Sequence, residues 1–193
     1  MKRTQHTLLA LALLTLPTTA SAQLVVVGNG GAAECYQYAL SGNMGTRSAL
    51  SACDGAFTDM LSKTDRAATH VNRGILLMRG GKLERAEADY DRALAIRPDL
   101  TEAYVNRGAA QIRQGNYTDA VESLTRSLED LDSPTRASAL YNRAIAHDNL
   151  ENDRAAYTDL KAAQAIRPEW ELVSNMLRRY TVTRKSDRAQ SGS

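Results

Sequence analysis

The sequence is poor in aromatic residues, cysteine and proline. Among its 193 residues are one Phe and one Trp, which leaves little aromatic surface on which nucleic-acid bases could stack. Its two cysteines, Cys35 and Cys53, do not form a Cys-x-x-Cys motif. Beyond Leu16 no apolar run approaches the ~20 residues that a membrane-spanning helix needs.

Recognisable catalytic motifs are also missing. The sequence contains no Gly-x-Ser-x-Gly elbow, no His-Glu-x-x-His pair and no Gly-x-x-x-x-Gly-Lys-Ser/Thr phosphate loop. His70 and His147 lie far apart, and neither has a second His or Cys at the spacing of metal ligands. We therefore expect no catalytic residues, no bound metal, no cofactor and no enzymatic activity.

Residues 25–33 imitate a nucleotide-binding loop. Three valines run into Gly-x-Gly-x-x-Ala, as a strand would run into a phosphate-binding turn. A dinucleotide site also needs a second strand that ends in an acidic residue. Asp54 is the only acidic residue near that spacing, and it falls in a segment that we expect to be helical. We therefore interpret residues 23–32 as a flexible leader.

The N-terminus resembles a secretory signal peptide. Lys2 and Arg3 precede an apolar run at 7–16, and Ala20-Ser21-Ala22 supplies a small-x-small cleavage site. The pattern predicts a signal peptide of residues 1–22, cleavage after Ala22 and a periplasmic or secreted protein. The run is too short for a spanning helix, so we expect no stable membrane anchor after cleavage.

Cleavage would change the charge of the chain. The full sequence has 24 basic and 22 acidic residues, and the signal peptide removes Lys2 and Arg3. The remainder has no formal net charge, whereas a nucleic-acid-binding protein usually carries a basic excess. We therefore expect no nucleic-acid partner.

A repeat dominates the rest of the sequence. Asn72-Arg73-Gly74 recurs as Asn106-Arg107-Gly108 and as Asn142-Arg143-Ala144, at spacings of 34 and 36 residues. A period near 34 is typical of stacked helix hairpins. Four further positions repeat after each triplet. A small residue occurs at Ala86, Ala120 and Ala156, and a larger apolar residue follows at Tyr90, Leu124 and Leu160. A second small residue occurs at Ala93, Ser127 and Ala163, and a proline ends each unit at Pro98, Pro134 and Pro168. The two extra residues of the middle copy fall within 128–133, where we expect a turn.

These positions resemble the tetratricopeptide repeat (TPR) family over residues 67–170. The resemblance implies an all-α fold, a right-handed superhelical stack of antiparallel helix hairpins, with repeats at 67–100, 101–136 and 137–170. The third copy departs most, since Ala144 replaces Gly and residues 151–153 replace the Gly-containing turn. Such a scaffold hosts many functions, so the resemblance alone does not decide the function.

Further helices are expected at both ends of the array. Segments 33–40 and 46–60 flank a Gly-rich turn and predict a degenerate N-terminal hairpin within 33–66. A Cys35–Cys53 disulfide would link its two helices and stabilise them by ~3 kcal/mol. The spacing of the two cysteines disfavours the alternative of a redox or metal site. A final helix is expected at 169–180, with Trp170, Val173 and Leu177 on one stripe, and the C-terminal capping segment is placed at 171–185. Residues 186–193 are expected to form a disordered tail.

The resemblance also implies a concave face, lined by the first helix of each hairpin, that binds extended peptides or helices. The positions of this predicted groove are Val71, Asn72, Ile75, Arg79, Val105, Asn106, Ala109, Arg113, Tyr141, Asn142, Ile145 and Asn149. The asparagines resemble the asparagine ladder of some family members. The chain departs from the carboxylate clamp of others, which places Lys where this sequence has Val71 and Ser138.

Two functional interpretations follow. The chain is either an adaptor that binds a protein segment in the predicted groove, or a structural subunit of an envelope or secretion assembly that uses its convex or terminal faces. The sequence leaves the oligomeric state open. The asparagines of the three triplets, Asn72, Asn106 and Asn142, form the Asn row. This row is compatible with ligand binding and with a structural role, because buried polar groups normally need hydrogen-bond partners.

The Arg row of the triplets is expected to be structural. Arg73, Arg107 and Arg143 each precede a polar residue by 16 positions, namely Asp89, Ser123 and Asp159. In a stacked hairpin this spacing places the Arg on the first helix and the polar residue on the second. We expect ion pairs or hydrogen bonds there that hold the two helices in register.

Overall fold

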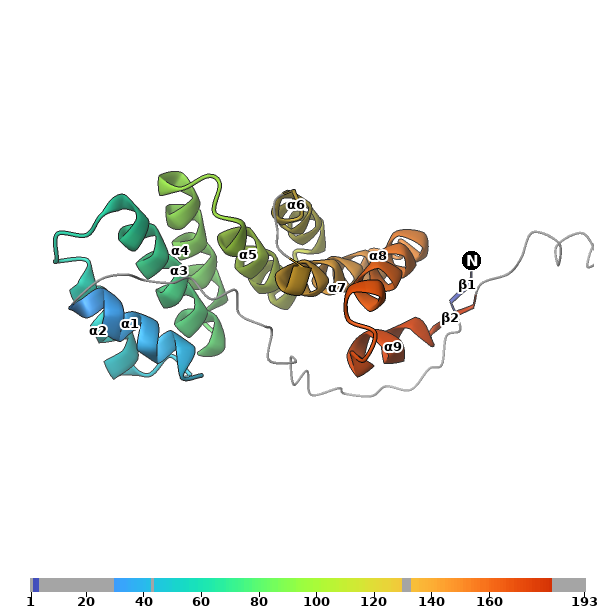
Figure 1. The fold of residues 1–193 in the computed structure, drawn as a ribbon, viewed down its shortest axis with the longest axis horizontal. Helices are drawn as coiled ribbons and strands as arrows, with labels where there is room; N and C mark the ends of the chain where they lie inside the picture. Colours follow the sequence, from blue (N-terminus) through green and yellow to red (C-terminus); the bar gives the residue numbers. More distant parts are fainter. Residues whose placement is uncertain (1, 4–29, 43, 130–132, 182–193) are drawn as a thin grey trace, which may run out of the picture. The chain divides into compact units, whose positions relative to one another are not determined.

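The computed structural model describes residues 2–3, 30–42, 44–129 and 133–181. The cleavage site of the predicted signal peptide, most of the predicted leader and the predicted tail 186–193 lie outside these residues. The chain divides into two compact units, of which one spans Ser21–Leu131 and the other combines Met1–Ala20 with Asp132–Ser193. Figure 1 shows the helices of both units.

The first unit consists of three helix hairpins. Its helices are α1 Gly31–Leu40, α2 Arg47–Ala56, α3 Lys63–Arg79, α4 Leu83–Ile96, α5 Thr101–Gln114 and α6 Tyr117–Ser127. Helices α1 and α2 pack against each other and both contact α3, while α4 contacts both α3 and α5.

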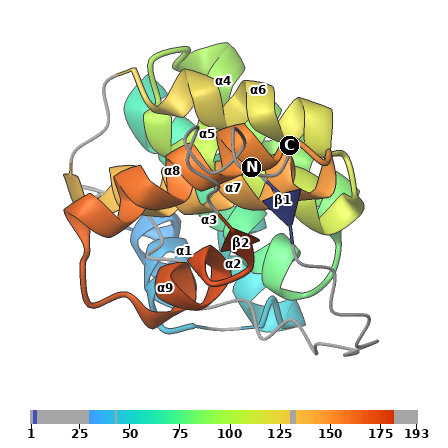
Figure 2. The ribbon, with the colours of Figure 1, turned by 90° about the vertical axis from the view of Figure 1, so that its right-hand side faces the viewer.

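The second unit contains the remaining hairpin and the C-terminal elements. They are α7 Ser133–Asn149, α8 Asp153–Ile166, α9 Glu171–Leu177 and two short strands, β1 Lys2–Arg3 and β2 Tyr180–Thr181. Helix α8 packs against α7 and α9. Strands β1 and β2 pair antiparallel and lie side by side in both views (Figures 1 and 2). Apart from this two-residue pairing, the described chain is helical, which confirms the predicted fold class.

Two helices are shorter than the sequence suggested. Helix α2 ends at Ala56, not near residue 60, because a turn follows in which the amide of Thr58 donates to the carbonyl of Gly55. Helix α9 ends at Leu177, well before residue 185. Tyr180 is already extended there, and its hydroxyl donates to Asp148 of α7 at 2.6 Å.

The Gly of each triplet allows close contact between the two helices of a hairpin. A Cβ placed on Gly74 would lie 2.5 Å from Cε1 of Tyr90, and one placed on Gly108 would lie 2.6 Å from Cγ of Leu124. Both distances are shorter than van der Waals contact, so any larger residue would push the helices apart. Ala144 and Leu160, the equivalent pair in α7 and α8, are both fully buried.

The turns between paired helices use left-handed backbone conformations. Gly81 and Gly115 take φ angles of 75° and 83°. Glycine adopts such positive φ angles without a steric clash, because it has no Cβ. The third repeat lacks the turn glycine, and there Glu151 takes a φ of 57°. A side chain in this region costs roughly 1–2 kcal/mol, so the third turn is locally strained.

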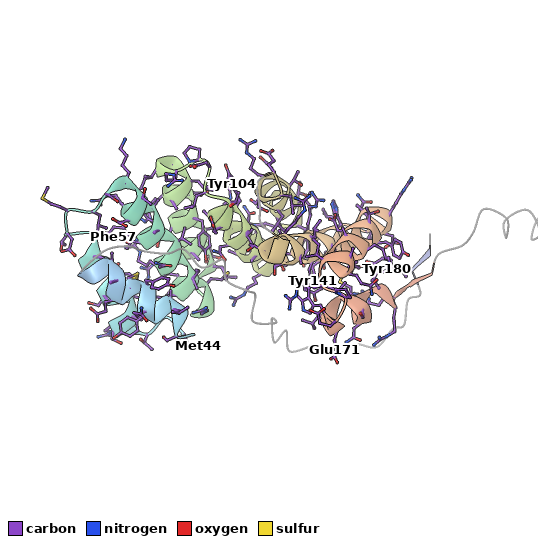
Figure 3. All side chains as sticks on the ribbon, in the orientation of Figure 1. Met44, Phe57, Tyr104, Tyr141, Glu171 and Tyr180 are labelled. Carbon is purple, nitrogen blue, oxygen red and sulfur yellow. A yellow bond between two sulfur atoms is a disulfide. The ribbon has the colours of Figure 1, made fainter. Side chains whose placement is uncertain are left out.

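A disulfide between Cys35 and Cys53 joins α1 to α2, as predicted. Both cysteines are fully buried. The α1–α2 turn, marked by Met44 in Figure 3, packs closely on the end of α3. Gly45 makes this approach possible, because a Cβ at its φ of 69° would overlap the carbonyl oxygen of Leu76. Among the described residues, no helix is long and apolar enough to span a bilayer.

The arginine and asparagine rows of the repeats

The Arg row joins the two helices of each hairpin. Arg73 on α3 donates from Nε and Nη2 to the two carboxylate oxygens of Asp89 on α4, at 2.7 and 2.6 Å. Arg143 on α7 donates in the same way to Asp159 on α8, at 2.8 and 2.7 Å. These paired bonds confirm the structural role predicted from the 16-residue spacing.

In the middle repeat a serine hydroxyl takes the place of the carboxylate and belongs to a longer hydrogen-bond network. Nε of Arg107 donates to the hydroxyl of Ser123 at 3.0 Å, and that hydroxyl donates to Oε1 of Gln111 at 2.7 Å. The Gln111 amide then donates to Glu87 of the preceding hairpin at 2.7 Å. Gln114 donates to the other oxygen of Glu87 at 2.8 Å. A serine therefore fits at this position because Oε1 of Gln111 accepts the hydrogen bond of its hydroxyl.

The Arg row also connects neighbouring hairpins, which the sequence did not suggest. Nη1 of Arg73 donates to Asp54 on α2 at 2.6 Å, and Nη1 of Arg107 donates to Asp91 on α4 at 2.9 Å. The guanidinium groups of Arg73 and Arg107 thus each bond to their own second helix and to the second helix of the preceding hairpin. Asp91 precedes Arg107 by 16 residues, a spacing that would have pointed to this second pair.

Asp89 is the most densely bonded acid in the first unit. It accepts hydrogen bonds from Arg73, from His70 and, at 2.9 Å, from Arg92. Burial alone would raise its pKa, but these bonds and the charge of Arg73 hold the pKa of Asp89 well below its usual range. Asp89 is therefore an ionised structural residue.

Two arginines of the predicted groove bond to helix ends. Arg79 on α3 donates to the carbonyl of Ala39 on α1, and Arg113 on α5 donates to the carbonyl of Met78 on α3, both at 2.5 Å. Positive charge is favourable at a helix C-terminus, where carbonyl groups lack partners. The third equivalent, Asn149, donates to Ile145 of its own helix at 2.9 Å. A ligand contact for these residues stays a prediction, and both guanidinium groups are already engaged.

The Asn row has a different environment. Asn72, Asn106 and Asn142 are only 3, 4 and 7 % exposed. In each of them the amide nitrogen Nδ2 is buried and has no hydrogen-bond partner among the described residues. Three further buried atoms share this property: the Tyr90 hydroxyl, the Ser138 hydroxyl and Nδ1 of His147.

The remaining residues of the predicted groove are less open than expected. Four of them are buried: Val71, Ile75, Val105 and Tyr141. Ala109 and Ile145 are half-buried, while Asn149 is exposed. Tyr141, seen in Figure 3, packs its ring against Trp170 at 4.9 Å between centroids. Its burial follows from the C-terminal segment that covers it.

Two surface clefts occur in the first unit, at other places. One of about 370 Å³ is formed by α5 and α6 around Tyr104, and one of about 500 Å³ by α1 and α2 around Tyr38. Neither is lined by a residue of the predicted groove.

Comparison with known proteins agrees with this geometry. Two family models described as tetratricopeptide repeat match residues 65–133 and 105–169. The chain belongs to the tetratricopeptide repeat family. The matches cover all three triplets, so the Arg and Asn rows lie within the TPR array.

The curated relatives of this TPR chain are much longer proteins. Human mitochondrial import receptor subunit TOM70 is 33 % identical over 113 residues, which are 56 % of this chain and 18 % of TOM70. Mouse sperm-associated antigen 1 is 31 % identical over 121 residues, which are 58 % of this chain and 13 % of that protein. The chain spans less than a fifth of the length of these relatives.

Solved structures share the TPR fold. Residues 41 to the end of MamA from Desulfovibrio magneticus RS-1 superpose with a TM-score of 0.65 at 21 % identity, covering 79 % of this chain and 84 % of that one. The second TPR domain of human RPAP3, solved with an HSP70 peptide, gives a TM-score of 0.57 at 22 % identity. It covers 61 % of this chain and 96 % of that one. At these identities the likeness concerns the fold alone.

Proposed function

We propose that the chain is a non-catalytic adaptor that binds an extended segment of a partner protein through the first helices of its repeats. Two of the structures similar to it are TPR domains of RPAP3 with bound HSP70 and HSP90 peptides. The family is therefore able to bind peptides, and the choice of residues in this chain must come from its own chemistry.

The Asn row carries the proposal. A buried donor without a partner costs about 1–3 kcal/mol, and this chain has one at the same position in three repeats. A peptide backbone offers a carbonyl group at every residue, so it can satisfy such donors whatever its sequence. The side chains are 3–7 % exposed, so binding requires neighbouring side chains to move aside, as is common at interfaces.

The charges on these helices favour a backbone ligand over a terminal carboxylate. Arg79 and Arg113 already donate to helix carbonyls. Val71 and Ser138 stand where a carboxylate clamp has Lys. Neutral amide groups thus remain as the main polar groups for recognition.

The test is the Asn72→Ala/Asn106→Ala double variant, probed with peptides selected from a phage-displayed library on the purified chain. We expect weaker binding with an unchanged or higher melting temperature, because each substitution removes an unpartnered buried amide. Asn116→Ala is the matched control, since this asparagine is exposed in the turn before α6. Unchanged affinity together with a lower melting temperature would make the row structural.

The second candidate is a structural subunit that docks through another face. The cleft of about 500 Å³ on α1 and α2 favours it, because the small residues Ser51, Ala52 and Gly55 of α2 line it. The same double variant separates the two candidates. If the double variant binds all the partners of the native chain, the interaction does not use the Asn row.

We also propose that the protein acts outside the cytoplasm, in the periplasm or as a secreted protein. The signal-like residues 1–22 motivate this, and a buried disulfide is compatible with an oxidising compartment. N-terminal sequencing of the protein from its native host tests it. A mature chain beginning at Gln23 is expected, and an intact Met1 in a cytoplasmic fraction would refute it.

A further inference from the structure

We infer that Ser138 and Asn142 on α7 form a two-point binding site for the backbone of one residue in an extended, uncharged peptide segment. The inference rests on the proposed function and adds a residue to it. Ser138 and Asn142 are 2 and 7 % exposed. The Ser138 hydroxyl and the Asn142 amide nitrogen both lack a partner among the residues that the structure describes.

The two side chains lie on the same face of one helix. Residues four apart in a helix are neighbours, with their Cβ atoms about 5–6 Å apart. In the other two copies the residue four before the Asn is Ala68 or Glu102. Helix α7 is thus the repeat helix in which a neutral hydroxyl accompanies the Asn, and in which both groups are buried without partners.

The chemistry of this pair matches an extended residue. In an extended chain the N–H and C=O groups of one residue point to the same side, which is why paired antiparallel strands exchange two bonds at a single residue. The Asn142 amide can donate to that carbonyl, while the Ser138 hydroxyl accepts from that N–H. Neither group could compensate a buried charge, so the bound residue is expected to be uncharged.

The same chemistry excludes a helical ligand. A helix keeps its N–H and C=O groups in its own i to i−4 hydrogen bonds, so it cannot offer both to a pair of side chains. The resemblance to the TPR family implies both extended peptides and helices as ligands. At this site the unpartnered groups select the extended form.

The role of Ser138 predicts an unusual response to mutation. Removing a buried hydroxyl that has no partner should leave the melting temperature unchanged or raise it, while it weakens binding. Ser127→Ala is the matched control. Ser127 is fully buried, but its hydroxyl donates to the Leu124 carbonyl at 2.7 Å, so its loss should lower the melting temperature and leave binding intact.

The experiment uses peptides selected from a phage-displayed library on the full chain. Each backbone amide of a selected peptide is replaced in turn by an ester, which removes the N–H without adding bulk. We expect one replacement to weaken binding to the native chain about fivefold to tenfold, as the loss of one hydrogen bond implies. Binding to Ser138→Ala should already be weaker and should change little on that replacement.

Several outcomes would overturn the inference. Equal ester effects on the native chain and on Ser138→Ala would show that the hydroxyl does not contact the peptide. A melting temperature that falls as in Ser127→Ala, with unchanged affinity, would make Ser138 structural. Equal affinity for a helix-stapled form of the same peptide would exclude the extended ligand.

The proposed function can fail separately. If Asn72→Ala/Asn106→Ala binds the selected peptides as tightly as the native chain while Ser138→Ala does not, the α7 site stands and the role of α3 and α5 falls. If Ser138→Ala binds normally while the double variant does not, only the α7 site falls. Failure to select any peptide would overturn both.

Discussion

Arg73 and Asp89 are joined by two parallel hydrogen bonds, of 2.7 and 2.6 Å, between α3 and α4. The carboxylate is almost fully buried and the guanidinium group largely so, with side-chain exposures of 1 and 18 %. Arg73 makes a third hydrogen bond, from Nη1 to Asp54, which extends this link to α2. One side chain therefore fixes the geometry of its own hairpin and its neighbour.

Replacing Arg73 with Ala should destabilise the chain by about 3 kcal/mol, because it leaves the buried Asp89 carboxylate with weaker compensation. The free energy of unfolding in urea measures this. Arg97→Ala is the control, since Arg97 pairs with the exposed Asp99 two residues away, and solvent-exposed ion pairs contribute little to stability. Similar losses for both variants would contradict the assigned importance of burial.

The lowered pKa of Asp89 predicts acid sensitivity. A carboxyl group whose folded pKa lies below its unfolded value stabilises the fold fully above the unfolded pKa, about 3.9. That contribution is lost as the pH falls from there through the lowered folded pKa. Urea midpoints between pH 7 and pH 2 should show a steeper loss below pH ~4 for the native chain than for Asp89→Asn. If the urea midpoints of the native chain and of Asp89→Asn fall in parallel with pH, the stabilising role of the ionised Asp89 is refuted.

Gly74→Ala should destabilise the first repeat by about 1–3 kcal/mol, because the new methyl group would overlap the Tyr90 ring. Adding Tyr90→Leu should restore part of the loss, since α7 and α8 combine Ala144 with Leu160. Gly55→Ala is the matched control. No atom lies within 4 Å of a Cβ placed there, so this change should be neutral or stabilise the helix by up to ~1 kcal/mol. Thermal and urea unfolding give both values.

Loss of the Cys35–Cys53 bond should lower stability by about 3 kcal/mol, because the bond closes a loop with a sequence separation of 18 residues. The Cys35→Ser/Cys53→Ser variant and the reduced native chain should unfold at similar urea concentrations. A reductant should have no effect on the variant. If the reductant does not change the urea concentration at which the native chain unfolds, the bond contributes little to stability.

The prediction from sequence was strongest for contacts within a hairpin. The Arg73–Asp89 and Arg143–Asp159 pairs followed from one 16-residue spacing. These contacts depend on two helices joined by a short turn. Such a turn fixes their register, so sequence distance translates directly into spatial distance.

Contacts between hairpins were harder to predict. Nothing in the triplets indicated that Arg79 would reach the Ala39 carbonyl or that Arg73 would also bind Asp54. The lengths of α2 and α9 were overestimated as well, because a turn at Gly55 and the anchored Tyr180 end them early. The arginine contacts depend on which groups of the neighbouring hairpin come within reach, and the helix ends depend on a local turn and on the contact of Tyr180 with Asp148.

The sequence by itself determined the repeat, the hairpins, the disulfide pair and the Arg pairs, because a regular period constrains residues that are close along the chain. Only the tertiary structure decided which polar groups remain without partners. Burial and hydrogen bonding depend on every neighbouring element at once, and no local spacing encodes them. That is why the Asn row was visible in the sequence as a set of equivalent positions, while the unpartnered amides and the Ser138 hydroxyl emerged only from the packed helices.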